Sequence, residues 1–188
     1  MAVVSPIRNI IYSLGLLMGI STFVQCCAYS IGQTSQPIIS VNFGANQGGR
    51  IREVLKYAVG TALAFGLIWT GAALAVPNLF VRIFMTPTDS ILKIAPAIIR
   101  SYGLSFLLLP LNIFSSYYFQ ALMKPTASFV VSVARGAVIS GILILVLPAV
   151  TTPSSIWFAM PITELIVAVY VAARMVRYTR RLPGAGTA

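Results

Sequence analysis

Long apolar stretches alternate with short polar segments along the chain. Five of these stretches are long enough to cross a lipid bilayer, because a spanning helix needs about 20 mostly apolar residues. They cover residues 10–41, 55–76, 91–122, 127–150 and 156–175. The pattern predicts an all-α membrane helix bundle within residues 1–182. We expect the Gly- and Ala-rich residues 183–188 to form a disordered tail.

The composition also indicates a membrane protein. The chain has 188 residues, of which 58% are hydrophobic and 9% are charged, whereas soluble domains average about 25% charged residues. The absence of histidine and the presence of only three acidic residues remove imidazole-based catalysis and leave little for metal binding. We therefore expect that the protein is not an enzyme and that it has no catalytic residue, metal site or cofactor.

The basic residues give the chain a net charge of +10, and they cluster between the apolar stretches. If the five helices alternate in direction, one side of the membrane carries Arg8, Arg82 and Lys93. The other side collects Arg50, Arg52, Lys56, Lys124, Arg174, Arg177, Arg180 and Arg181. Cytoplasmic loops are enriched in Lys and Arg, so the C-terminus should be cytoplasmic and the N-terminus outside. Nucleic-acid binding is not expected, because no continuous basic stripe exists.

Charged residues inside the predicted spans are the first functional candidates, because each is costly there without a partner. Glu164 is the only acid well inside a span. It either binds a coupling proton or cation, or forms an ion pair with a basic group such as Arg135, or lies near the interface. Arg135 either lines a water-filled cavity or extends to the cytoplasmic surface near Lys124, as long basic side chains do.

Neutral polar residues form a second group of candidates. They either line a substrate cavity or join helices by hydrogen bonds, which are worth roughly 1 kcal/mol each in a membrane. The candidates for substrate contact are Gln25, Gln33, Gln36, Asn112, Tyr117, Tyr118 and Gln120.

A third group contains candidate helix breaks and gating positions. Transporters use broken helices to bend or to expose carbonyl groups at a site, although membrane helices also carry prolines without such a role. These candidates are Pro37, Asn42, Gly44, Pro110 and Pro161. We expect Gly44 to adopt the left-handed conformation that ends a helix.

Three sequence motifs carry a more specific resemblance. Residues 32–45 read GQTSQPIISVNFGA and are followed by Arg50. This segment resembles the G-x-x-x-x-Q-P-I-x-S-x-N-[YF]-G-A signature of the multidrug and toxic compound extrusion (MATE) family, in its branch of bacterial multidrug exporters. Residues 114–125, FSSYYFQALMKP, are similar to the family turn F-x-x-x-F-Q-A-x-G-K-P, with Met123 where Gly is usual. Residues 132–135, SVAR, resemble the following S-x-x-R.

The resemblance implies a fold and an activity. Family members have twelve helices in two lobes, and the motifs place this chain at helices eight to twelve. The N-terminal lobe and the preceding helix would then be partners, together with the lipid bilayer. The resemblance also implies export of cationic small molecules, coupled to Na⁺ or H⁺ entry, in the bacterial inner membrane.

Two alternatives remain open. One is a lipid or polysaccharide flippase of the same superfamily, whose cavity should carry several basic residues for a pyrophosphate headgroup. The other is a non-transporting membrane assembly module, in which the polar residues only hold the helices together.

Overall fold

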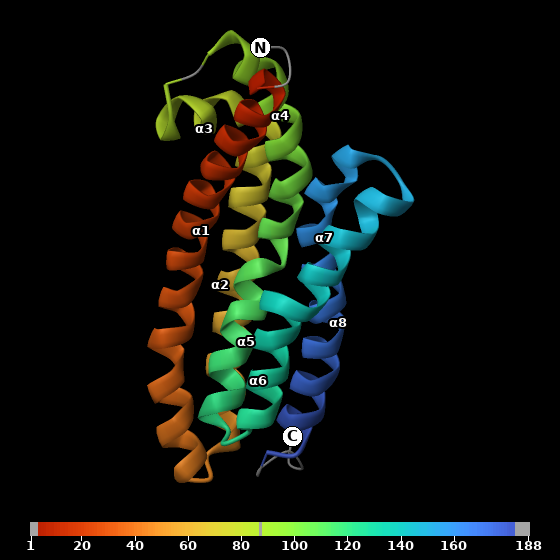
Figure 1. Cartoon of the computed structure of the whole chain (residues 1–188). Helices are drawn as coiled ribbons and strands as arrows, with labels where there is room; N and C mark the ends of the chain where they lie inside the picture. Colours follow the sequence, from red (N-terminus) through yellow and green to blue (C-terminus); the bar gives the residue numbers. More distant parts are fainter. Residues whose placement is uncertain (1–3, 87, 183–188) are drawn as a thin grey trace.

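The computed structural model describes residues 4–86 and 88–182, and those residues form a bundle of helices without strands (Figure 1). Five of its segments are long and apolar enough to cross a membrane: Leu14–Gly44, Gly48–Ala75, Ile91–Ala121, Pro125–Val150 and Pro153–Arg180. The predicted all-α bundle is therefore confirmed. The tail expected at residues 183–188 lies outside the described residues.

The first two spans are α1 (Val4–Gly44) and α2 (Gly48–Ala75), joined by a tight turn. The backbone amide of Gln47 donates to the carbonyl of Asn42 at 2.9 Å and closes this turn. The residue in the left-handed conformation is Asn46, with φ of 56°. The expectation that Gly44 would adopt this conformation is therefore wrong. Asn tolerates it better than most residues because its side chain is short and polar.

Helix α2 begins earlier than the apolar pattern suggested. Arg50 and Arg52 lie in its first turns, before the apolar stretch that was predicted to span residues 55–76. The reason is that the apolar stretch marks the part of a helix inside the bilayer, whereas the helix itself continues into the polar interface. Arg, Glu, Leu and Lys are all good helix formers, and nothing in residues 48–55 interrupts the helix.

The third apolar stretch is divided into several elements. After the short α3 (Pro77–Phe84), the chain forms α4 (Asp89–Gly103), a 3₁₀ segment η1 (Leu104–Leu107) and α5 (Leu109–Ala121). Pro110 lies in the first turn of α5, where its missing N–H costs no helical hydrogen bond. At η1 the bundle is very close-packed, because a Cβ built on Gly66 of α2 would collide with the carbonyl oxygen of Leu107.

The last two spans also contain irregular segments. The fourth consists of α6 (Pro125–Val133), a π-helical segment η2 (Ala134–Val138) and α7 (Ile139–Val150). The fifth consists of a 3₁₀ segment η3 (Pro153–Phe158) and α8 (Ala159–Arg180). Pro161 lies in the first turn of α8, whereas Pro37 lies inside the uninterrupted α1.

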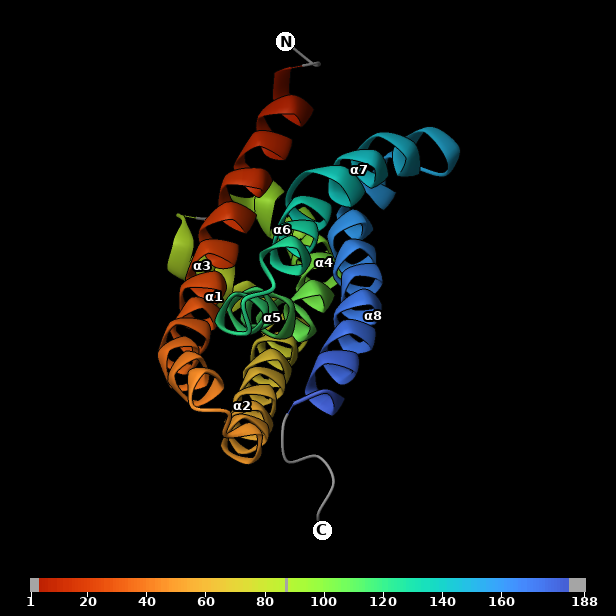
Figure 2. The same cartoon turned by 90° about the horizontal axis from the view of Figure 1, so that it is seen from below.

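Helix α5 occupies the centre of the bundle and contacts α1, α2, α6 and α8 (Figure 2). Its large side chains Phe114, Tyr118 and Phe119 are fully buried. The α1–α2 turn, the α5–α6 turn and the end of α8 lie at the same end of the bundle (Figure 1). The basic residues of these three segments are therefore grouped as the sequence analysis expected, while the side of the membrane that they face stays a prediction.

Candidate functional site

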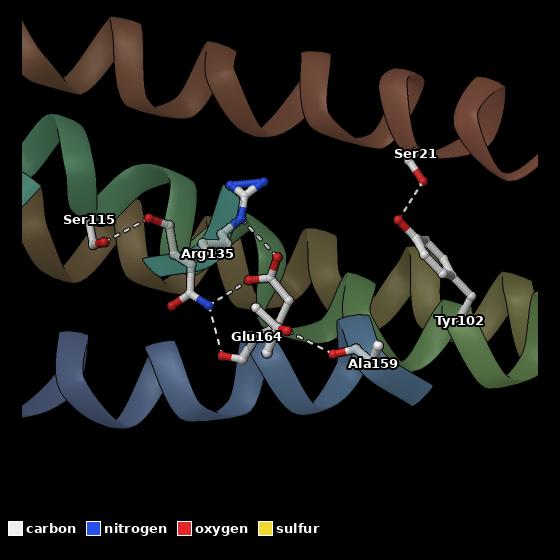
Figure 3. A network of polar contacts seen from close by, with 8 residues as sticks. Ser21, Tyr102, Ser115, Arg135, Ala159 and Glu164 are labelled. Atoms are coloured by element: carbon white, nitrogen blue, oxygen red, sulfur yellow. Dashed lines mark hydrogen bonds and ion pairs between the residues drawn. The ribbon is translucent and has the colours of Figure 1, made fainter. Parts of the chain in front are cut away.

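A buried ion pair joins the fourth span to the fifth (Figure 3). Arg135 Nε donates to Glu164 Oε1 at 2.9 Å. Glu164 is completely buried, whereas the Arg135 side chain is 17% exposed. The sequence analysis left three interpretations of Glu164 open, and the structure contains the ion pair with Arg135. Whether Glu164 also binds a coupling ion stays a prediction.

Asn112 completes the surroundings of the carboxylate. Its Nδ2 donates to Glu164 Oε2 at 2.6 Å and to the Glu164 backbone carbonyl at 2.9 Å. Both carboxylate oxygens are thereby hydrogen-bonded, which is what a buried charge requires. Asn112 Oδ1 is buried and has no hydrogen-bond partner among the described residues. Asn112 therefore serves as a donor to Glu164 and is not part of an exposed cavity wall.

The π-helical segment determines where Arg135 lies. Arg135 is the second residue of η2, and a π-helical turn holds an extra residue that changes the direction of the following side chains. The residue lies about ten positions after the start of α6, or about 15 Å along the helix axis. If the hydrocarbon core, which is about 30 Å thick, begins near the start of α6, the ion pair lies near its middle.

Arg135 also borders a polar cavity of about 460 Å³. The cavity lies between α1, α5 and the α6–η2 region, and it is lined by Gln25, Tyr29, Ile113, Ser116, Tyr117, Gln120, Val131, Ser132, Arg135 and Gly136. Tyr29 and Tyr117 form an edge-to-face pair whose ring centroids are 6.4 Å apart. Polar groups at mid-bilayer depth are costly against lipid, so this cavity is the best candidate for a functional site.

Four of the eight predicted cavity residues line this cavity: Gln25, Tyr117, Gln120 and Arg135. Gln36 lies beside it, because its Nε2 donates to Gln120 Oε1 at 3.4 Å. Gln33 is exposed on α1 and does not belong to the lining.

The other two predicted cavity residues point elsewhere. Asn112 contacts Glu164. Tyr118 is fully buried, and its hydroxyl is 2.6 Å from the Thr179 hydroxyl on α8. Consecutive residues on a helix point about 100° apart. Tyr117 therefore faces the cavity, while Tyr118 lies on a different face of α5 and points toward α8.

Tyr29, Ser116 and Ser132 also line the cavity, although they were not among the predicted cavity residues. A helical spacing would have indicated two of them. Tyr29 follows Gln25 by four residues, and Ser132 precedes Arg135 by three, and both spacings put two side chains on one helix face.

The candidate gating residues lie at different depths. Asn42 is near the end of α1, and its Nδ2 donates to the carbonyl of Ile38 at 2.8 Å. Gly44 is the last residue of α1. Pro110 and Pro161 each lie in the first turn of a helix that follows a 3₁₀ segment, so the irregular backbone precedes them. Their role in gating stays a prediction.

The geometry defines a class of protein, namely a multi-pass membrane domain of five candidate spans with a polar cavity between its helices. The family model MatE matches residues 6–147. A solved structure described as the outward-facing conformation of a multidrug resistance MATE family transporter of the MOP superfamily is similar, with a TM-score of 0.85 and 13% sequence identity. The match covers 93% of this chain and 40% of that one. No curated protein sequence matches.

The chain belongs to the MATE family. Members of this family are transporters, so the chain is not an enzyme, as its composition predicted. The chain spans only about 40% of the length of the solved transporter. Its fold therefore corresponds to part of the helical architecture of that solved structure.

Proposed function

We propose that the chain is the C-terminal part, helices eight to twelve, of a secondary active transporter that exports cationic small molecules by Na⁺ or H⁺ antiport. The cavity bordered by Tyr29, Tyr117 and Arg135 carries this proposal. Secondary transporters bind substrate near the bilayer midplane, at the interface between two related lobes. A polar cavity at that depth in a chain of the MATE family supports such a role.

The partner in this proposal is the N-terminal lobe, together with the helix that precedes α1. Exposed polar side chains along the middle of α1, such as Ser30, Gln33 and Thr34, would face lipid if the chain were alone. Contact with a second lobe would cover them and complete the substrate cavity. The chain alone should therefore not transport.

The cavity lining favours a cationic aromatic substrate over a pyrophosphate-linked lipid. Tyr29 and Tyr117 present aromatic rings, whose faces attract cations, and Gln25 and Gln120 are neutral. Arg135 is the only basic residue in the lining, and its charge is balanced by Glu164. A flippase for an anionic headgroup would need several basic residues there.

Glu164 is the proposed coupling group. Because Arg135 now occupies one of its oxygens, an incoming proton or Na⁺ must replace that guanidinium. The exposed part of Arg135 borders the cavity, so the displaced side chain has a polar space to enter. Exchange of partners on Glu164 would then link ion entry to a change in the charge of the substrate cavity.

We further propose that the protein is inserted in the bacterial inner membrane with its C-terminus in the cytoplasm. The grouping of Arg50, Arg52, Lys124 and Arg180 at one end supports this orientation, because positive residues favour the cytoplasmic side.

Drug resistance in a hypersensitive bacterial strain tests the proposed function. The full-length parent should give resistance to cationic aromatic drugs, and Tyr29→Leu or Tyr117→Leu in that parent should reduce it. Tyr57→Leu is the matched control, because Tyr57 is an exposed tyrosine on α2 outside the cavity lining. Resistance from the 188-residue chain alone would contradict the need for a second lobe.

A further inference from the structure

A second hollow lies on the opposite side of α5 from the polar cavity. It is a groove of about 620 Å³ between α2 and α8, with α5 as its floor. Leu111 lines the groove, whereas Ile113, Ser116, Tyr117 and Gln120 line the polar cavity. These four residues follow Leu111 by two, five, six and nine positions, which correspond to rotations of about 140° to 240° around the helix axis. The two hollows therefore open on opposite faces of the bundle.

The groove combines an apolar wall with basic residues at one end. Its apolar part is formed by Leu55, Val59, Leu111, Val171, Met175 and Val176, and Gly60 widens it. Its basic end is formed by Arg52, Lys56 and Arg180. Arg52 Nη2 donates to the carbonyl of Leu182 at 3.2 Å, which connects α2 to the segment that follows α8. Apolar walls with charges at only one end match an amphiphilic ligand.

The length of the groove matches one leaflet of a bilayer. Arg52 and Gly60 are eight residues apart on α2, and Val171 and Arg180 are nine residues apart on α8, so the groove extends about 12 to 14 Å along the helices. Half of a hydrocarbon core of about 30 Å is about 15 Å. A ligand with its headgroup at Arg52 would therefore place its apolar part along the inner half of the bilayer.

We propose that this groove binds a phospholipid with an anionic headgroup, whose phosphate contacts Lys56 and Arg180 and whose acyl chain lies along the α2–α8 groove. The charges at this end favour an anion, because Glu53 is the only acid among the basic residues grouped there. Juxtamembrane Lys and Arg residues attract anionic lipids. The substrate cavity opens on the opposite face, so a lipid in the groove leaves that cavity accessible.

Native mass spectrometry of the detergent-solubilised chain tests this site. The probes are phosphatidylglycerol and phosphatidylethanolamine with identical acyl chains. The chain should retain phosphatidylglycerol in preference to phosphatidylethanolamine. The double variant Lys56→Gln/Arg180→Gln should weaken phosphatidylglycerol binding roughly 30-fold. Each basic residue near an anionic lipid strengthens binding roughly fivefold, and the two factors multiply. Binding of phosphatidylethanolamine should weaken much less, because the ammonium group of its headgroup balances the charge of the phosphate that both lipids share.

Gly60→Leu tests the apolar part of the groove. A Cβ at Gly60 meets no atom within 4 Å, so a leucine is tolerated by the fold and fills the space that the acyl chain needs. This variant should weaken the binding of both lipids. Gly71→Leu is the matched control, because Gly71 is an equally open glycine on α2 that lies outside the groove. Arg177→Gln is the control for charge, since Arg177 is an exposed basic residue outside the lining.

Several results would overturn the proposal. Equal retention of both lipids, or unchanged phosphatidylglycerol binding in Lys56→Gln/Arg180→Gln, would contradict headgroup recognition whatever the other variants show. Displacement of the lipid by the same concentration of inorganic phosphate would indicate a site for a free anion. A change in oligomeric state of Gly60→Leu, measured by light scattering, would instead identify the groove as an interface between copies of the chain.

Discussion

The two members of the buried ion pair should respond differently to removal of the partner. We expect Arg135→Met to destabilise the protein more than Glu164→Gln does. The reason is their unequal exposure, because Glu164 is completely buried while 17% of the Arg135 side chain is exposed. A carboxylate left without Arg135 keeps a single side-chain hydrogen-bond donor among the described residues, namely Asn112. An arginine left without Glu164 can turn toward the polar cavity that it already borders.

The magnitudes follow from these environments. Breaking a buried pair by removing one partner costs about 3–5 kcal/mol, and we expect Arg135→Met to lie in this range. Glu164→Gln removes charge-assisted hydrogen bonds but leaves a group that can still bond to Asn112, so about 1.5–3 kcal/mol is expected. The double variant should cost less than the sum of the two single variants by at least about 2 kcal/mol, since it leaves no unpaired charge.

Equilibrium unfolding in mixed micelles measures these free energies, with fluorescence of Trp69 and Trp157 as the signal. Arg177→Met is the control, because Arg177 is exposed at the end of α8. That variant should change the free energy of unfolding by no more than about 0.5 kcal/mol. All four variants and the unchanged chain are compared in one detergent, so that the double-variant cycle isolates the coupling between the two side chains.

Additivity of Arg135→Met and Glu164→Gln within about 0.5 kcal/mol would refute the reasoning, because it would mean that the pair is not coupled. If Glu164→Gln lowered the free energy of unfolding more than Arg135→Met does, this would contradict the argument that Arg135 can turn toward the cavity when Glu164 is replaced. The same Glu164→Gln substitution in the full-length parent tests coupling. Transport should lose its dependence on pH or Na⁺ while drug binding survives, and unchanged ion dependence would exclude Glu164 as the coupling group.

Three further predictions concern the backbone and the topology. Met123→Gly should stabilise the chain by about 1 kcal/mol in the same unfolding assay, because Met123 has a φ of 56° and its side chain is 74% exposed. Gly66→Ala should lower the free energy of unfolding by about 1–3 kcal/mol, because the added Cβ collides with the carbonyl of Leu107. Gly71→Ala is the control, because Gly71 lies at an open position. It should leave the free energy of unfolding unchanged or raise it slightly. Alkaline phosphatase fused to the C-terminus should be inactive, and an active fusion would contradict a cytoplasmic C-terminus.

The spans were predictable from sequence because the bilayer imposes a length and an apolar composition on each of them. The ends of the helices were not, since α2 begins at Gly48 while its apolar stretch begins near Leu55. The α1–α2 turn shows a similar limit. Gly44 was the expected left-handed residue from its type alone, but Asn46 takes that conformation because it lies at the point where the chain reverses.

The site was only partly predictable because it depends on contacts between distant segments. A pairing of Arg135 with Glu164 was one of the alternatives that charge alone suggested. The role of Asn112 was not visible, since its bonds to Glu164 join positions 52 residues apart. The π-helical segment that carries Arg135 was not predicted from the sequence either.

The two faces of α5 explain why a part of this size would need a second lobe. Tyr117 and Gln120 face the polar cavity together with Arg135, whereas Leu111 faces the apolar groove. The apolar face is compatible with lipid, because acyl chains satisfy it without any protein contact. The polar face is not, since an arginine exposed to the hydrocarbon core costs at least about 2.5–3.5 kcal/mol. Covering that face with a second lobe removes this cost and at the same time encloses the cavity in which a substrate would bind.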